Sequence, residues 1–227
     1  MQLSPRPLKF VIVSLLIMVA RLNAADIFDG PAFSASPEAL RQASETVKPG
    51  KDSDATVLLN ETHFTFDTAG RATEVRHRIY RVETQEGVNE WSEVSAQWAP
   101  WHQSKPEIKA RTITAEGAAH ALDPNTLEDL PVHEDAPAMY SDARKFGGPL
   151  PAVAPGAIVE EEVTLTDTAP FFAPGTTTER SFAWYVAVNK TRVVLSYPES
   201  YPIRYKLHLL PQISVNKSSA NHVETIR

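Results

Sequence analysis

Residues 56–82 read TVLLNETHFTFDTAGRATEVRHRIYRV, and this stretch decides the fold. Its two halves, 56–66 and 72–82, are rich in β-branched and aromatic residues and follow the period of two that is typical of β-strands. The separator DTAGR opens with Asp67 and carries Gly70, which can supply a positive φ in a turn. The stretch therefore predicts a β-hairpin of two long strands.

Further strand-like runs lie on the C-terminal side of this hairpin. They span residues 88–98, 107–115, 157–166, 178–188, 192–197 and 202–210. The run 202–210 has the clearest alternation, because Ile203, Tyr205 and Leu207 alternate with basic residues. Short strands separated by turn signals predict an all-β fold, which we expect to be an antiparallel β-sandwich.

The remaining segments divide the chain. Residues 1–24 are expected to be a signal peptide, and residues 25–54 a lead-in with a short helix that begins at Ser36-Pro37-Glu38. The sandwich is expected to span residues 55–211, crossed by a long Pro-rich loop over residues 121–156. Residues 212–227 are interpreted as a polar tail, truncated from a longer chain.

The N-terminal stretch has the order of a secretory signal. Arg6 and Lys9 precede an apolar run from Phe10 to Ala20, and small residues at Ala24 and Ala25 follow. An eleven-residue run is short of the roughly 20 residues of a membrane span, so cleavage is favoured over anchoring. We expect an exported protein, periplasmic or extracellular, with no stable membrane insertion.

The composition excludes several function classes. The 227 residues include no cysteine, so the chain has no thiol nucleophile, no disulfide and no Cys-ligated metal. The net charge is −6, and an acidic surface repels the phosphates of nucleic acids, which are therefore not expected partners. No cofactor is indicated.

The densest acidic cluster is Glu160-Glu161-Glu162. On a strand, Glu160 and Glu162 would share one face, which we interpret as solvated. Glu161 would lie on the apolar face and need a partner, for which Arg180 and Arg192 are candidates. A hydrolase that uses these carboxylates as an acid–base pair is the less favoured interpretation, since nothing in the sequence separates the pKa values of Glu160 and Glu162.

Two other patterns could bind metal ions. His63 and His77 could approach each other across the hairpin with Glu61 as a third ligand, although surface or cross-strand histidines are the default. Residues 123–129, DPNTLED, place oxygen ligands at alternating positions but lack the Gly of a calcium loop. A turn with a helix cap is the favoured interpretation there, and no metal site is predicted.

An ordered set of short motifs resembles a known family. The set includes WAPWHQ at 98–103, IKAR at 108–111, YSDAR at 140–144, PLP at 149–151 and PGAIVE at 155–160. It resembles the bacterial domain of unknown function 3857, which typically lies N-terminal to a transglutaminase-like domain in exported proteins. The resemblance covers about residues 55–210.

The resemblance implies a β-sandwich outside the cytoplasm and supplies no catalytic residues. We expect a non-catalytic module that accompanies a transglutaminase-like or peptidase-like domain, in the same or a neighbouring chain. It would position that domain or bind its peptide or cell-wall substrate. The candidate interaction surface comprises Trp98, Trp101, Tyr140, Asp142, Arg144 and Glu160.

A second hypothesis is a stand-alone carbohydrate- or peptide-binding module. Trp98 and Trp101 form a tight aromatic pair that could act as a platform if both are exposed. Aromatic residues on strands are more often part of the core, so exposure of these two side chains discriminates between the two roles.

Overall fold

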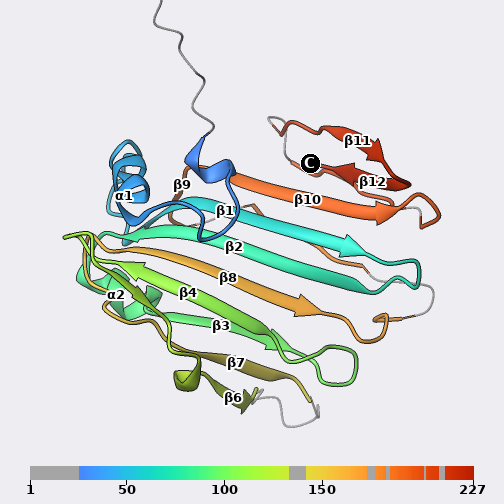
Figure 1. Cartoon of the computed structure of the whole chain (residues 1–227), viewed down its shortest axis with the longest axis horizontal. Coiled ribbons are helices and arrows are strands. Elements are labelled where there is room, and N and C mark those ends of the chain that lie inside the picture. Colours follow the sequence, from blue (N-terminus) through green and yellow to red (C-terminus); the bar gives the residue numbers. More distant parts are fainter. Residues whose placement is uncertain (1–25, 133–141, 173–176, 183–184, 202, 210–212) are drawn as a thin grey trace, which may run out of the picture.

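The computed structural model describes residues 26–132, 142–172, 177–182, 185–201, 203–209 and 213–227. These residues form a mainly β structure with a broad sheet, a small sheet and two short α-helices (Figure 1). The elements are η1 (Ile27–Asp29), α1 (Pro37–Glu45), β1 (Ala55–Phe66), β2 (Ala72–Val82), α2 (Gln85–Trp91), β3 (Glu93–Trp98), β4 (Glu107–Ile113), β5 (Ala119–Ala121), η2 (Pro124–Thr126), β6 (Glu128–Pro131), β7 (Arg144–Pro149), β8 (Ile158–Thr166), β9 (Ala187–Val188), β10 (Thr191–Pro198), β11 (Lys217–Ala220) and β12 (Val223–Ile226).

The predicted hairpin is confirmed and lies at the centre of the large sheet. Its strands β1 and β2 pair antiparallel, and the turn between them places Gly70 at φ 81°. The strand order of the large sheet is β11-β12-β10-β1-β2-β8-β4-β5, with β9 also paired to β1. The small sheet has the order β3-β7-β6.

The predicted antiparallel sandwich is wrong in two respects. The large sheet is mixed, because β10 and β9 both run parallel to β1. The second sheet has three strands and does not match the first in size. Its buried side chains Val94, Ala96 and Phe146 pack on only part of the large sheet, in a core that also contains Ile108 and Val163.

The opposite face of the large sheet is covered by the N-terminal lead-in. Phe28 and Leu40 form a second core there with Ile79, Ile113 and Ile158. Lateral ion pairs hold the lead-in in place, since Lys190 Nζ lies 2.8 Å from Asp29 and 3.0 Å from Asp26. Both faces of the large sheet are therefore covered over much of their area.

Asp29 is the centre of this lateral network. Hydrogen bonds lower the pKa of Asp29 to about 2, and the bond from Lys190 has a larger effect than the bond from Arg192. Arg227, the last residue of the sequence, also lies 3.1 Å from the Asp29 carboxylate. The network therefore joins the lead-in, β10 and the segment after β12.

The expected N-terminal helix is α1, and α2 was not expected. In α1, Ser36 accepts a hydrogen bond from the Ala39 amide and Pro37 is the first residue, as the sequence signal indicates. In α2, Thr84 caps the amide of Gly87 at 3.0 Å. The predicted strand at 88–98 therefore begins only at Glu93.

The C-terminal part differs most from expectation. No strand forms within residues 203–209, and Leu209 is 84% exposed with a φ of 56°. The predicted tail instead contains the hairpin β11–β12, and β12 pairs with β10. Of the predicted strand at 178–188, the described part forms only β9.

The described part of the central Pro-rich section is more regular than predicted, because η2 and the strands β6 and β7 alternate there with irregular segments. Asp123 caps η2 by accepting from the Asn125 amide at 2.9 Å, which confirms a turn with a helix cap. Within the described residues, no helix is both long and apolar enough to cross a membrane.

Candidate functional site

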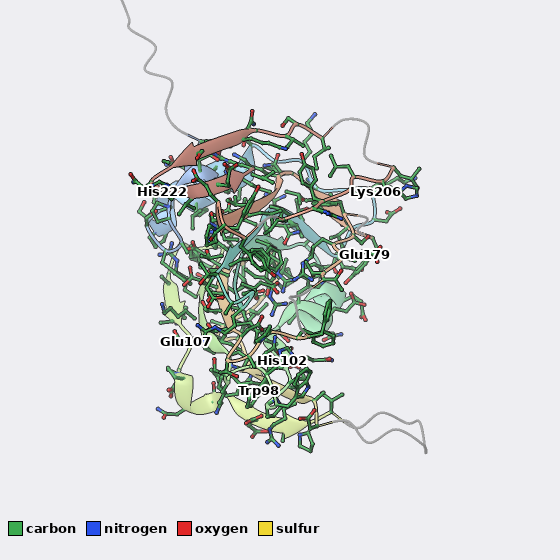
Figure 2. The ribbon with its side chains drawn as sticks, turned by 90° about the vertical axis from the view of Figure 1, so that its right-hand side faces the viewer. Trp98, His102, Glu107, Glu179, Lys206 and His222 are labelled. Carbon is green, nitrogen blue, oxygen red and sulfur yellow. The ribbon has the colours of Figure 1, made fainter. Side chains whose placement is uncertain are left out.

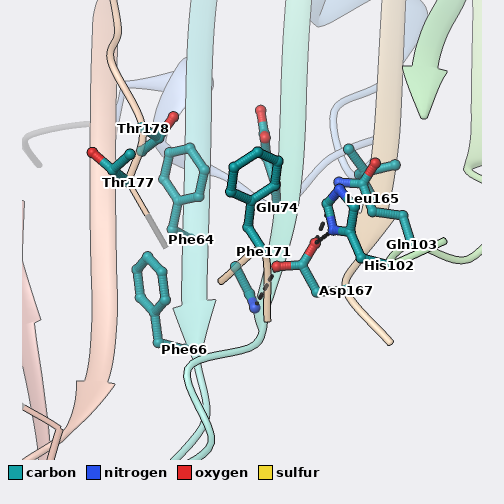
Figure 3. A pocket seen from close by; sticks show the side chains of 11 residues that line it. Phe64, Phe66, Glu74, His102, Gln103, Leu165, Asp167, Phe171, Thr177 and Thr178 are labelled. Atoms are coloured by element: carbon teal, nitrogen blue, oxygen red, sulfur yellow. Dashed lines mark hydrogen bonds and ion pairs between the residues drawn. The ribbon is translucent and has the colours of Figure 1, made fainter. Parts of the chain in front are cut away.

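A pocket of about 290 Å³ opens beside the loop after β3 (Figure 3). The C-terminal ends of β1 and β8 and the N-terminal end of β2 meet this loop there. It is lined by Phe64, Phe66, Ala72, Glu74, His102, Gln103, Leu165, Asp167, Phe171, Thr177 and Thr178. Phe64, Glu74 and Leu165 are neighbours in the sheet register, so their side chains share one face. His102 lies in the half of the molecule opposite to His222 of the C-terminal hairpin (Figure 2).

Aromatic rings form the floor and one wall of this pocket. Phe64 and Phe66 stack with ring centroids 6.2 Å apart, and both are buried. Phe171 packs edge-on against His102 at 5.4 Å and contacts Trp101 at 5.5 Å. Phe171 is half-exposed, so the wall that it forms is accessible from solvent, and Trp101 lies beside it, also half-exposed, outside the lining of the pocket.

The polar end of the pocket is His102 with Asp167. The loop after β3 folds into a tight turn in which the His102 amide donates to the Ala99 carbonyl, and the His102 carbonyl accepts from Thr168 at 2.7 Å. Gln103 and Asp167 form an isolated antiparallel bridge that joins this loop to the segment after β8. These backbone contacts fix the imidazole beside the carboxylate.

Neither group is fully paired. The His102 residue is 6% exposed, and its Nδ1 has no hydrogen-bond partner. This atom lies 3.6 Å from Asp167 Oδ1, which is within ion-pair range but too far for a hydrogen bond. The Asp167 carboxylate accepts from the Ala72 amide at 3.0 Å and from Gln103 Nε2 at 3.3 Å.

The second acid of the pocket, Glu74, forms an ion pair with an arginine. The Arg180 guanidinium lies 2.5 Å from Glu74 Oε1 and 5.1 Å from the centroid of the Phe64 ring. Arg76 also approaches Glu74, at 3.7 Å. Two residues of the lining, Glu74 and Phe64, therefore both contact one guanidinium, that of Arg180.

Glu160 is buried on the other face of the large sheet, and the prediction that it faces solvent is wrong. It is 1% exposed and accepts from the Phe33 amide at 2.7 Å, from His77 at 2.9 Å and from Arg111 at 2.8 Å. Burial raises its pKa, but the bonds from His77 and Phe33 and the charge of Arg111 outweigh burial and hold the pKa below its usual value.

Glu161 is buried on the apolar face of the large sheet, which packs against the small sheet, as the alternation predicts. Its ion-pair partner is not one of the two predicted arginines. Arg78 lies 2.6 Å from Glu161, whereas the two predicted candidates bind elsewhere, Arg180 to Glu74 and Arg192 to Glu61. Because the carboxylates of Glu160 and Glu161 each pair with an arginine, this cluster is a structural one. A charged carboxylate held by arginine is poorly suited to act as a general acid.

The histidines of the hairpin are also engaged in pairs. His63 contacts Glu61 at 2.8 Å, and Glu61 faces His77 across the hairpin, yet His77 bonds to Glu160. Burial, and then the charge of Arg227, lower the pKa of His63. Among the described residues, no three histidine or acidic side chains are grouped as a metal site would require.

Comparison with known proteins identifies the family. A family model described as "Domain of Unknown Function with solved-structure structure (DUF3857)" matches residues 68–226. The chain belongs to this family. A search of curated proteins found no match to this chain.

Solved structures are similar to this DUF3857 domain over most of its length. A "putative protease" from Parabacteroides distasonis is similar with a TM-score of 0.68 and 16% identity, over 76% of this chain and 34% of that one. The chain thus spans about a third of that structure's length. An M1 zinc metallopeptidase from Deinococcus radiodurans matches at a TM-score of only 0.38 and 11% identity, over 77% of this chain and 38% of that one.

The candidate interaction surface of this DUF3857 domain is only partly brought together. Trp98 and Arg144 are register partners on β3 and β7, but Trp98 is partly buried against the core, and Arg144 is paired with Asp129 at 2.8 Å. Trp101 is 52% exposed and contacts Phe171, which lines the pocket. Asp142 is exposed, and Tyr140 lies outside the described residues. Glu160 does not belong to the surface.

Sequence reasoning missed Asp167 and Phe171 altogether. Phe171 lies in the segment 169–175, which reads only as a cluster of turn residues, and Asp167 lies just before it. The signal that could have found the pocket is the motif WAPWHQ, whose last two residues, His102 and Gln103, line the pocket and whose Trp101 contacts Phe171 of the lining. The site thus combines aromatic walls with a few converging polar groups, an arrangement that is typical of ligand pockets.

Proposed function

We propose that this DUF3857 domain is an exported, non-catalytic module that accompanies a transglutaminase-like or peptidase-like catalytic domain. In this proposal, the pocket between His102, Asp167 and Phe171 binds the peptide substrate of that domain. The module raises the local concentration of substrate near the catalytic site and leaves bond cleavage to its partner.

One observation carries the proposal. The fold matches about a third of a longer chain whose description names a protease, with a TM-score of 0.68. This likeness supports a domain that works within or beside a larger protein. At 16% identity it supplies the fold alone, so the role of the pocket is argued from its own chemistry.

The pocket suits a peptide side chain in size and character. Its volume of about 290 Å³ is at the lower end of the range for ligand pockets, which favours one side chain over a large cofactor. Phe64 and Phe66 supply an apolar floor, and the exposed rings of Trp101 and Phe171 can pack against the adjacent peptide backbone.

A titration tests this role. The purified chain, labelled with ¹⁵N, is titrated with a peptide digest of a soluble protein while amide and indole resonances are recorded. We expect shifts at Trp101, Gln103 and Phe171, and no new peptide fragments in the mixture by mass spectrometry. Shifts confined to residues outside the pocket, or no shifts, would contradict peptide binding here; release of fragments would contradict a non-catalytic role.

Export is part of the proposal and has its own test. The order of charge, apolar run and small residues over positions 1–24 supports cleavage after Ala24 or Ala25. The intact mass of the protein secreted by a bacterial host should correspond to a chain that begins at Ala25 or Asp26. A mass that retains residues 1–24 would contradict cleavage.

A carbohydrate-binding module is the second candidate, because Trp101 is half-exposed as that role requires. The other predicted platform residue, Trp98, packs against the core, so a flat two-ring platform does not form. Titration with soluble cell-wall oligosaccharides separates the roles. Binding that is lost in Trp101→Ala and retained in Asp167→Asn would favour the carbohydrate role.

A further inference from the structure

Asp167 is a nearly buried carboxylate with an incomplete set of partners. Its side chain is 9% exposed. Its two hydrogen bonds come from neutral groups, the backbone amide of Ala72 and the side-chain amide of Gln103. An ionised carboxylate can accept about four hydrogen bonds. Within the described residues, no lysine or arginine lies within ion-pair distance of it. A charge that is buried and under-paired is costly, which favours a cation beside Asp167.

His102 does not fill that place. Its Nδ1 points toward Asp167 Oδ1 across 3.6 Å (Figure 3), and this atom is buried without a hydrogen-bond partner. Backbone hydrogen bonds to Ala99 and Thr168 fix the turn that carries His102, and its imidazole packs against the rings of Trp101 and Phe171. One polar atom of the pocket therefore remains unpaired beside an under-paired carboxylate.

The walls around Asp167 suit an organic cation. The rings of Phe64, Phe66 and Phe171 line the same pocket, and aromatic faces attract cations. The other acid of the lining shows this arrangement, since Glu74 pairs with the Arg180 guanidinium, which also lies 5.1 Å from the centroid of the Phe64 ring. Asp167 has the carboxylate and the aromatic neighbours of that arrangement without its cation.

We propose that the pocket binds a primary ammonium group of a peptide, held by the Asp167 carboxylate and the aromatic rings of Phe64, Phe66 and Phe171. The inference rests on the proposed function, since it takes the pocket to be a peptide site and names the group that the site selects. An aliphatic stem would lie along the phenylalanines and the ammonium would donate to Asp167. The ammonium is either a lysine side chain or a peptide N-terminus.

Calorimetric titration of the purified chain tests the selectivity with three probes. N-acetyl-lysine methylamide carries the side-chain ammonium, and N-acetyl-norleucine methylamide has a side chain of similar length without the charge. Norleucine methylamide with a free amino group supplies the terminal ammonium instead. We expect one of the two cationic probes to bind at least about tenfold more tightly than the neutral probe. The cationic probe that binds more tightly identifies the source of the ammonium.

Two variants locate the effect. Asp167→Asn keeps an oxygen that can accept from the Ala72 amide and removes the charge, so it should abolish the tenfold preference. The matched control is Asp129→Asn, which removes an aspartate paired with Arg144 on the small sheet and should leave the preference intact. If Asp167→Asn does not fold, the wild-type affinity for the cationic probe must still fall as salt rises, while that for the neutral probe does not.

The outcomes separate this inference from the proposed function. Equal affinity for the cationic and neutral probes overturns ammonium selectivity and leaves peptide binding in place. A preference that survives in Asp167→Asn overturns the assignment to Asp167. Absence of binding by all three probes overturns the inference, whereas pocket shifts with the peptide digest would still support the peptide-binding role.

Discussion

At the scale of single residues, Glu160 combines a carboxylate with a buried position. It is almost completely buried and joins three parts of the chain, through Phe33 in the lead-in, His77 on β2 and Arg111 on β4. We predict that Glu160→Gln lowers the free energy of unfolding by about 3 kcal/mol, because it leaves Arg111 without its anionic partner. Urea denaturation of the purified chain measures this loss.

Glu162→Gln is the matched control for that substitution. Glu162 lies two residues further along the same strand and is only 3.6 Å from the exposed Lys109. Removal of a solvated pair of this kind should change the unfolding free energy by less than about 0.5 kcal/mol. Equal effects of the two variants would show that the network around Glu160 has no special role in stability.

The same residue gives a pH dependence. The pKa of Glu160 in the folded chain is held below its ordinary value of 4.5, so its stabilisation is present above that pH and is lost as the pH falls through the folded pKa. The gap in unfolding free energy between wild type and Glu160→Gln should therefore be constant near neutral pH and narrow below about pH 4.5. A gap that widens on acidification would contradict this sign.

The wrong prediction that Glu160 faces solvent has a clear physical origin. Period-two alternation predicts which residues share a face of a strand, but it does not tell which face meets solvent. Here β8 is covered on one side by the lead-in and on the other by the small sheet. Glu160 and Glu161 are thus both buried although they point in opposite directions, and each is accommodated by an arginine.

At the scale of elements, α2 depends on a glycine for close packing. A Cβ atom on Gly87 would lie 2.1 Å from the backbone oxygen of Asp54, which cannot move aside as a flexible side chain would. Alanine normally stabilises a helix by about 1 kcal/mol relative to glycine. We predict the opposite sign for Gly87→Ala, a loss of about 2 kcal/mol measured by thermal or urea unfolding.

Glu90→Ala on the same helix serves as the control. Glu90 is exposed, so this substitution should remain within about 0.5 kcal/mol of wild type. If Gly87→Ala proves as stable as Glu90→Ala, the close approach of α2 to the segment before β1 is not as tight as described.

The C-terminal hairpin is a structural part of the sheet. Ile226 is buried and faces Leu195 of β10, whereas Val223 on the same strand is exposed. We predict that Ile226→Ala destabilises the chain by about 2 kcal/mol and that Val223→Ala costs less than about 1 kcal/mol. Equal, small effects in denaturation curves would instead suit a loosely attached tail.

Sequence patterns predicted the local elements better than the long-range pairings. The β1–β2 hairpin follows from two alternating runs and a turn that carries Gly70, all within 27 residues. Nothing in the sequence of β10 reveals that it runs parallel to β1, because its partner lies about 130 residues earlier. The alternation at 203–209 was misleading, because these residues form no strand and β10 pairs with β1 and β12.

At the scale of the whole molecule, the pocket is assembled from segments that are distant in the sequence. Phe64 and Glu74 come from the central hairpin, His102 from the loop after β3, and Asp167 and Phe171 from the segment after β8. The bridge between Gln103 and Asp167 brings the last two segments together. Such a site is determined by topology, and the sequence therefore indicated only its WAPWHQ component.

The central claim is that this pocket binds a peptide through an ammonium group. A crystal structure of the purified chain soaked with the more tightly bound of the two cationic probes tests it most directly. We predict density for the stem over Phe64 and Phe66, with the ammonium nitrogen within hydrogen-bond distance of the Asp167 carboxylate. An empty pocket at saturating probe, or a probe bound with its ammonium directed away from Asp167, would contradict it.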